Sequence, residues 1–263
     1  MIDLLSKPTY DVNDLKRIVA ILRAPGGCQW DGEQTHQSIR RNFLEEAYEV
    51  AEAIDEESTE HLQEELGDVL LQVVFHASIE EDAGRYDLND VADGICRKLI
   101  YRHPHVFGNV AVNSTDEILS NWEELKKAEK GQNSQADAVD AVARSLPALW
   151  RAEKMQKKAA KVGFEWPDVN GAMVKLSEEL EEVQAAMNGD GDVTEELGDL
   201  LFAAVNTARF LSVDSETALH AACDKFAARF RRVEEEAAAQ GKRLEDMSLA
   251  EMDALWDAVK HRG

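Results

Sequence analysis

The sequence predicts an all-α fold built from two tandem helical-bundle domains. Helical periodicity dominates the chain, whereas alternating runs rich in Val, Ile and Thr are scarce. The five prolines sit at positions that suit helix edges. An ordered set of motifs also occurs twice, about 130 positions apart, which is typical of a duplicated domain.

Paired acidic motifs are the most informative part of this repeat. Each copy has the pattern EExxE, a gap, and then ExxD. The members are Glu45, Glu46, Glu49, Glu65 and Asp68 in the first copy, and Glu178, Glu179, Glu182, Glu196 and Asp199 in the second. Either half of the pattern alone is weak evidence in a chain with 52 acidic residues, and the evidence comes from the ordered duplication.

The turn inside each copy predicts a helical hairpin. On a helix, residues three or four apart share a face, so each acid pair points one way. Segment 56–59 interrupts the first acidic helix, with Ser58 or Thr59 as the next N-cap. Residues 188–191, Asn-Gly-Asp-Gly, form the corresponding turn in the second copy. Two antiparallel helices can therefore bring the acid pairs together.

A glycine lies between the two acids of each ExxD motif, at Gly67 and Gly198. Glycine inside a helix costs about 1 kcal/mol relative to alanine. Its presence at the same place in both copies indicates close approach by a neighbouring backbone or a ligand.

Other motifs repeat in the same order and define the domain limits. Gly27-Cys-Gln-Trp30 corresponds to Gly163-Phe-Glu-Trp166, Lys98-xxx-Arg102 to Lys225-xxx-Arg229, and Trp122 to Trp256. Later helix starts are expected at Ser114, Pro147 and Ser248. Residues 128–144 are small and polar, as in a linker. The expected domains are therefore 1–127 and 145–263, joined by 128–144.

Charge and cysteine content exclude several classes of protein. A net charge of −23 argues against nucleic-acid and anionic-membrane partners, which require basic surfaces. Three cysteines without a CxxC pair argue against a disulfide framework or a zinc site and favour the reducing cytoplasm. The chain has no long apolar stretch, so neither a signal peptide nor a membrane span is expected.

Carboxylate-only clusters favour a hard divalent cation, namely Mg²⁺, Mn²⁺ or Ca²⁺. Mg²⁺ commonly leaves part of its coordination shell to substrate phosphates. The Lys-xxx-Arg pairs present two cations on one helical face and suit phosphate oxygens. Trp122 and Trp256 could offer a flat surface to a base. Together these features predict metal-assisted chemistry on a phosphorylated substrate.

Two other classes remain open at this point. An acidic duplicated bundle can act as a non-catalytic bivalent adaptor. A di-iron carboxylate protein is the second alternative, but such bundles use Glu-x-x-His pairs. Asp68 and Asp199 occupy the corresponding positions here, which argues for a redox-inert cation.

The combined motifs resemble the two-domain MazG family of nucleoside triphosphate pyrophosphohydrolases. The resemblance covers nearly the whole chain and rests on Gly27-Cys-Gln-Trp30-Asp31, Leu44-Glu-Glu-Ala-Tyr-Glu49-Val, Glu65-Leu-Gly-Asp68, Arg102-His-Pro-His-Val-Phe107, Ser145-Leu-Pro-Ala-Leu149 and Val162-Gly-Phe-Glu-Trp166. It implies all-α domains that form a homodimer. It also implies Mg²⁺-dependent cleavage of NTPs and dNTPs to monophosphate and pyrophosphate, with Mn²⁺ as a possible substitute.

The resemblance also implies the site residues. In the second domain the metal ligands would be Glu179, Glu182, Glu196 and Asp199, and the nucleotide contacts would include Lys175, Lys225, Arg229 and Trp256. Glu179 and Asp199 would also face the nucleotide through the metal. The corresponding metal set in the first domain would be Glu46, Glu49, Glu65 and Asp68. Lys225 and Arg229 would neutralise charge on the triphosphate, and Glu178 is a candidate general base. The family's expected seat of hydrolysis is the second domain, whereas the residues themselves leave that choice open.

Overall fold

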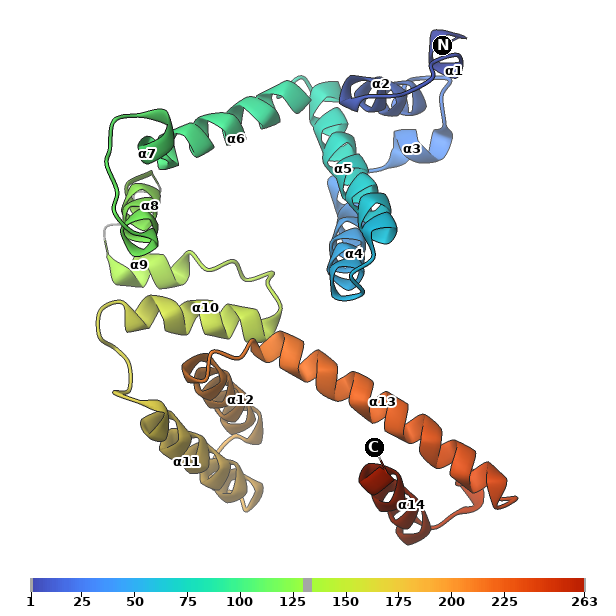
Figure 1. Cartoon of the computed structure of the whole chain (residues 1–263), viewed down its shortest axis with the longest axis vertical. Helices are drawn as coiled ribbons and strands as arrows, with labels where there is room; N and C mark the ends of the chain where they lie inside the picture. The colour runs from blue at the N-terminus through green and yellow to red at the C-terminus, as the bar shows by residue number, and fades with distance from the viewer. Residues whose placement is uncertain (1, 130–133, 263) are drawn as a thin grey trace. The chain divides into compact units, whose positions relative to one another are not determined.

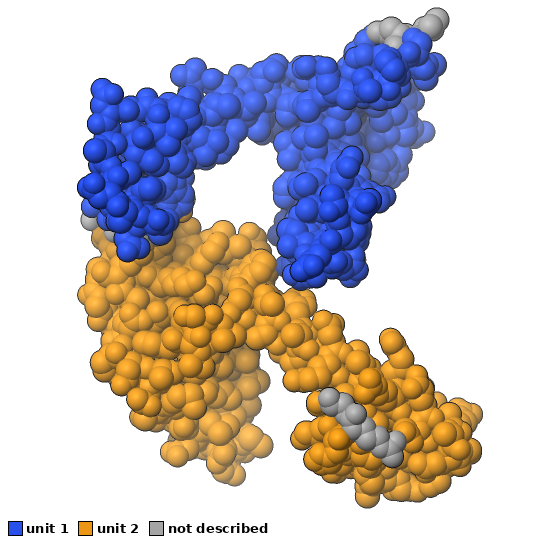
Figure 2. All heavy atoms as spheres, in the orientation of Figure 1, with its two compact units in different colours: residues 1–125 blue, residues 126–263 orange. Residues whose placement is uncertain are grey.

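The structure is a computed structural model that describes residues 2–129 and 134–262. Every regular element in these ranges is helical, so the all-α prediction is confirmed (Figure 1). The chain divides into two compact units, residues 1–125 and 126–263 (Figure 2). The predicted domain limits at 127 and 145 stay a prediction, and residues 130–133 of the expected linker lie outside the described residues.

The N-terminal unit is organised around one long helical hairpin. Helices α4 and α5 form this hairpin, and α2 packs on α5. The helices are α1 Ile2–Leu5, α2 Val12–Arg23, α3 Gln29–Glu33, α4 His36–Asp55, α5 Thr59–Asp82, α6 Leu88–Arg102, α7 Pro104–Phe107 and α8 Thr115–Glu129, the last of which crosses the division at 125.

The C-terminal unit repeats this plan with α11 and α12 as the hairpin and α10 packed on α12. Its helices are α9 Gln135–Asp140, α10 Ala148–Ala160, α11 Val169–Met187, α12 Val193–Phe210, α13 Ser215–Ala239 and α14 Leu249–Arg262, with the short 3-10 helix η1 Leu244–Asp246 before α14. Helix α9 lies inside the segment expected to be a linker and packs on α10.

The helix boundaries at both hairpin turns agree with the sequence. Ser58 caps α5 by accepting a hydrogen bond from the His61 amide, after Glu57 has adopted a φ of 54°. Helix α11 ends at Asn188, and Asp192 caps α12 through the Thr194 amide. Each cap satisfies a backbone N–H that the helix leaves unpaired, so the short turns between hairpin helices are locally encoded.

A buried carboxylate ties the end of α5 to neighbouring segments. Glu80 is 7% exposed, and its Oε1 lies 2.8 Å from Nη2 of Arg85 and 2.6 Å from Nε2 of His36. The Arg85 guanidinium and then the His36 imidazole lower the pKa of Glu80 to about 2. Burial of the paired His76 imidazole, followed by repulsion from His36, lowers the pKa of His76.

Among the described helices, none is long and apolar enough to cross a membrane.

We expect Glu80→Gln to destabilise the protein at pH 7, because the folded state favours the ionised carboxylate. This contribution is present in full above the ordinary pKa of 4.5 and is lost as the pH falls toward about 2. Urea unfolding midpoints measured from pH 7 to pH 2.5 should therefore converge for variant and wild type at the acidic end. Glu64→Gln, at an exposed position on the same helix, is the matched control and should show no such convergence.

Candidate metal and nucleotide site

Each hairpin gathers three carboxylates on its inner face. In the N-terminal unit Glu46 and Glu49 of α4 meet Glu65 of α5, and in the C-terminal unit Glu179 of α11 meets Glu196 and Asp199 of α12. One oxygen from each member of a trio lies within 4.8 Å of the other two. The structure thus joins the two halves of each acidic motif across the turn.

Lys175 is paired with one member of the C-terminal trio, Glu179. Its Nζ lies 2.8 Å from Glu179 Oε1, 3.7 Å from Glu178 and 3.8 Å from Glu182. The hydrogen bond to Glu179 is the main cause of the raised pKa of Lys175. Burial, followed by repulsion from Glu182 and other acids, raises the pKa of Glu196.

Glu179 shows that this trio fits a metal ion. Its side chain is among the most buried charged groups at 5% exposure, and its Oε2 is buried with no hydrogen-bond partner among the described residues. A buried carboxylate oxygen without a partner is costly unless a cation satisfies it. All three donors are carboxylates, which suit Mg²⁺ or Mn²⁺ better than softer metals.

The N-terminal trio has no lysine at the corresponding position. Four residues before Glu46 the chain has Asn42, whereas four residues before Glu179 it has Lys175. Burial, and then a hydrogen bond in which protonated Glu46 donates to Glu49, raise the pKa of Glu46. The nearest described base is His61, whose Nε2 lies 3.1 Å from Glu65. The pKa of His61 is raised chiefly by its hydrogen bond to Glu56.

Several predicted site residues do not join these trios. Asp68 and Glu182 fall outside them, although their charges contribute to the raised pKa of Glu46 and Glu196, respectively. Lys225, Arg229 and Trp256 lie on α13 and α14, and Trp256 packs 5.3 Å from the Phe226 ring. Helix α13 is a continuous helix of 25 residues that runs away from α12 (Figure 1). Among the described residues, neither Lys225 nor Arg229 forms an ion pair with a carboxylate of the C-terminal trio.

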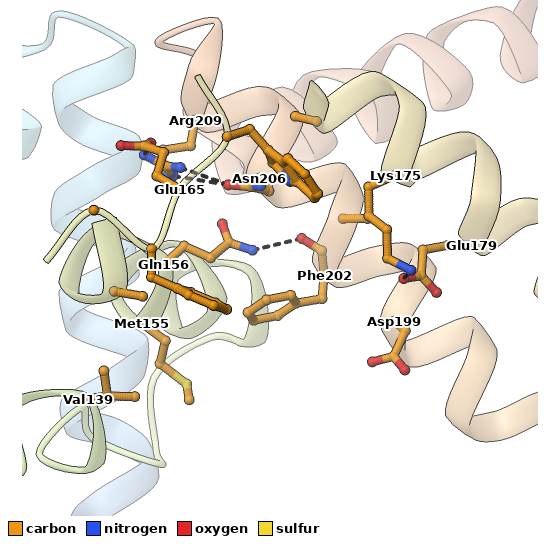
Figure 3. Close-up of a pocket in the computed structure, with 16 residues that line it drawn as sticks. Val139, Met155, Gln156, Glu165, Lys175, Glu179, Asp199, Phe202, Asn206 and Arg209 are labelled. Atoms are coloured by element: carbon orange, nitrogen blue, oxygen red, sulfur yellow. Dashed lines mark hydrogen bonds and ion pairs between the residues drawn. The ribbon is translucent and has the colours of Figure 1, made fainter. Parts of the chain in front are cut away.

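A cavity of 530 Å³ adjoins the C-terminal trio, and the sequence motifs did not identify it. Lys175, Glu179 and Asp199 line one end, and aromatic and amide side chains line the remainder (Figure 3). The lining residues are Val139, Met155, Gln156, Ala159, Gly163, Phe164, Glu165, Trp166, Ala172, Lys175, Glu179, Asp199, Phe202, Ala203, Asn206 and Arg209. Cavities of 300–1,000 Å³ that combine apolar walls with a few polar groups are typical of small-ligand sites.

The corresponding space in the N-terminal unit is filled by side chains. The repeat aligns Met155 with Val19, Phe202 with Leu71 and Asn206 with Phe75. Val19 and Phe75 belong to the buried core, and Leu71 packs against it. The Arg23 guanidinium covers the Phe75 ring at 5.0 Å, which closes this region further. The sequence already contains this difference, because the two copies carry different side chains at these three aligned positions.

The hairpin glycines do not mark a close approach within the chain. A Cβ added at Gly67 or at Gly198 would meet nothing within 4 Å. The expectation of a neighbouring backbone is therefore wrong for the single chain, because the helix face at each glycine is open. A ligand or a second chain remains as the reason for the small residue.

Comparison with known proteins identifies the family. The model of the MazG nucleotide pyrophosphohydrolase domain matches twice, at residues 34–107 and 170–233, and each match contains one hairpin and its carboxylate trio. The chain belongs to the MazG family. It is accordingly a nucleotide pyrophosphohydrolase, a hydrolase that acts on acid anhydrides, so the family membership favours this activity over the adaptor and di-iron alternatives.

Similarity to individual MazG relatives extends over nearly the full length. The chain is 43% identical to a nucleoside triphosphate pyrophosphohydrolase of Escherichia coli, covering 95% of this chain and 98% of the relative. It is 42% identical to the nucleoside triphosphate pyrophosphohydrolase/pyrophosphatase MazG of Thermotoga maritima, covering 94% of each. An uncharacterised protein, YabN of Bacillus subtilis, is 48% identical over 95% of this chain and extends well beyond it.

We expect Mg²⁺ or Mn²⁺ to raise the thermal unfolding midpoint more at pH 8 than at pH 5. Metal binding displaces protons from carboxyls such as Glu46 and Glu196, whose pKa values are raised in the folded protein. Differential scanning fluorimetry measures the shift. The double variant Glu46→Gln/Glu179→Gln should lose it, whereas Glu181→Gln, at an exposed position of α11, should keep it. An equal shift in all three proteins would contradict metal binding at the trios.

Proposed function

We propose that the C-terminal carboxylate trio hydrolyses NTPs and dNTPs to the monophosphate and pyrophosphate with Mg²⁺, or with Mn²⁺ in its place. The proposal rests on three features that occur at one place: the buried Glu179 Oε2 without a hydrogen-bond partner, Lys175 paired with Glu179, and an adjoining cavity of ligand size. The trio would anchor the triphosphate end of a nucleotide, and the cavity would take the remainder.

The chain's own residues then have separate roles. Glu179, Glu196 and Asp199 would hold the metal, with Glu182 nearby to complete the set. A cation bound there supplies polarisation of phosphate oxygens and acidification of water. Lys175 is placed to exchange its contact with Glu179 for a phosphate oxygen. Glu178, with its side chain 56% exposed beside Lys175, is free to take a proton from the attacking water as general base.

The N-terminal trio is proposed to bind metal without turning over nucleotide. Glu46, Glu49 and Glu65, with Asp68 close by, offer the same oxygen donors as the C-terminal trio. The neighbouring space is occupied by Phe75 and its packed core, which leaves a nucleotide less room than the C-terminal cavity does. This contrast supports the second domain as the seat of hydrolysis.

We further propose that the enzyme is a homodimer whose partner supplies Lys225, Arg229 and Trp256. Helix α12 keeps Leu197 and Leu201 at 47% and 54% exposure, and Gly198 between them in the sequence meets open space. Small residues flanked by leucines allow close helix packing, and burial of such a patch is favourable. Phe226 and Phe230 on α13 are also exposed and offer a complementary surface.

The remaining expectations concern setting and organisation. The acidic composition supports a cytoplasmic enzyme that takes free nucleotides as substrate, with no nucleic-acid or membrane partner. The domain limits 1–127 and 145–263, joined by 128–144, are retained as part of the proposal.

Asp199→Asn should lower the rate of pyrophosphate release from NTPs by about 100-fold, equivalent to ~2.7 kcal/mol of transition-state stabilisation. Its N-terminal counterpart Asp68→Asn should leave the rate near that of wild type, because Phe75 and its packed core take up the corresponding space in that unit. Product analysis by ion-exchange chromatography would separate NMP and pyrophosphate from NDP and phosphate. Near-normal turnover in Asp199→Asn, or loss in Asp68→Asn, would remove the assignment.

Mixing two inactive variants tests the shared site. Asp199→Asn lacks a metal ligand and Arg229→Ala lacks a phosphate contact, and each should be inactive alone. Exchange of subunits creates one intact site per mixed dimer if the two residues come from different chains, so activity should reappear. Leu201→Glu should give a monomer in light scattering, whereas Leu249→Glu, at the exposed start of α14, should remain a dimer. Failure of the mixture to recover would place both residues in one chain.

A further inference from the structure

The cavity beside the C-terminal trio holds a buried amide whose orientation is fixed. Gln156 of α10 is 8% exposed, and its Nε2 donates a hydrogen bond to the backbone oxygen of Phe202 at 2.8 Å (Figure 3). Rotating the amide by half a turn would place two acceptor oxygens face to face. The amide nitrogen therefore donates to the backbone of α12, and Oε1 is the amide atom without a fixed partner.

This leftover oxygen has no protein partner. Gln156 Oε1 is buried and accepts no hydrogen bond from any described residue, while the side chain itself lines the cavity. Buried polar atoms are almost always paired, and an unpaired acceptor costs stability. A ligand that brings an N–H into the cavity would remove this cost.

The cavity walls suit a flat aromatic ligand with polar edges. Trp166 and Phe202 line it and are 45% and 43% exposed, so their rings have uncovered faces. Asn206 also lines it, and its Oδ1 accepts from Arg209 Nη2 at 2.8 Å, so its Nδ2 remains as a donor. Arg209 is itself held by Glu165. The site thus combines one fixed acceptor with one oriented donor, as recognition of a base edge requires.

The duplicated unit shows that packing alone does not require a glutamine there. The repeat offset of 136 between Gly163 and Gly27 places Ala20 at the position of Gln156. Phe75 stands at the position of Asn206 and is buried in the core. The amide pair therefore occurs only in the copy that has the cavity beside its carboxylates.

We propose that Gln156 is a base-recognition residue: its Oε1 accepts a hydrogen bond from an amino or imino N–H of the nucleobase, which stacks on the cavity's aromatic side chains. The proposal rests on nucleotide hydrolysis at the C-terminal trio. The cavity's place next to Glu179 and Asp199 puts the base within one nucleotide's reach of the metal-bound phosphates. All common bases carry such an N–H, so the contact selects for a base without selecting strongly among the four.

Deletion of a single amino group from the substrate tests the contact in the wild-type enzyme. Two pairs of nucleotide and analogue are available: ATP with purine riboside 5′-triphosphate, and CTP with 2-pyrimidinone riboside 5′-triphosphate. The pair is used whose parent nucleotide, ATP or CTP, the enzyme hydrolyses faster. We expect kcat/KM to fall about tenfold for the analogue, mainly through KM, because the acceptor stays unpaired in the complex. Equal values for parent and analogue would overturn the proposal.

The variant Gln156→Leu removes the acceptor. It should lose activity on the parent nucleotide but not on the analogue, so that the ratio between them approaches one. A purely structural role for Gln156 would lower both equally and would also overturn the proposal. Gln184→Leu, at an exposed position of α11, is the control and should keep the wild-type ratio. Absence of pyrophosphate release from every nucleotide in the wild type would instead overturn the proposed function itself.

Discussion

Repulsion among three carboxylates on one face of a helical hairpin is the constraint on which the site depends. At separations below 5 Å the ionised groups destabilise one another, and burial together with this repulsion raises the pKa values of Glu46 and Glu196. The short, well-capped turns hold the helices together despite the repulsion. A divalent cation would relieve this repulsion, and metal binding at a trio would then stabilise its hairpin.

The two copies resolve the same constraint differently. The C-terminal unit places Lys175 against Glu179, whereas the N-terminal unit has Asn42 at that position. One copy keeps a cavity beside its trio, and the other fills the space with Phe75 under Arg23. A packed core stabilises a unit more than an open cavity does. The N-terminal unit is therefore built for stability, and the C-terminal unit keeps the cavity in which a ligand can bind.

The sequence predicted what depends on local spacing. The i,i+3 positions, the Ser58 cap and the 188–191 turn determine the hairpins, and these determine the trios. It did not predict the cavity, because a cavity depends on volumes that side chains from four helices and a loop leave unfilled. It could not place Lys225 and Arg229 relative to the trio, since the direction of α13 follows from tertiary packing and not from periodicity. Gly198 was recognised as unusual, but its open surroundings could be seen only in three dimensions.

The net charge of −23 explains why the site needs its few cations so closely placed. A nucleoside triphosphate approaching this protein meets a repulsive field, so long-range steering cannot raise its local concentration. Under the proposed function, recognition would come from short-range contacts: Lys175 and a divalent cation for the phosphates, and apolar walls with oriented amides for the base. Because the Gln156 and Asn206 amides and the aromatic rings are uncharged, their contacts are insensitive to the field that disfavours the phosphates. Binding energy from the base can then offset part of the cost of bringing the triphosphate to an acidic surface. The nucleobase thereby contributes to catalysis at the triphosphate.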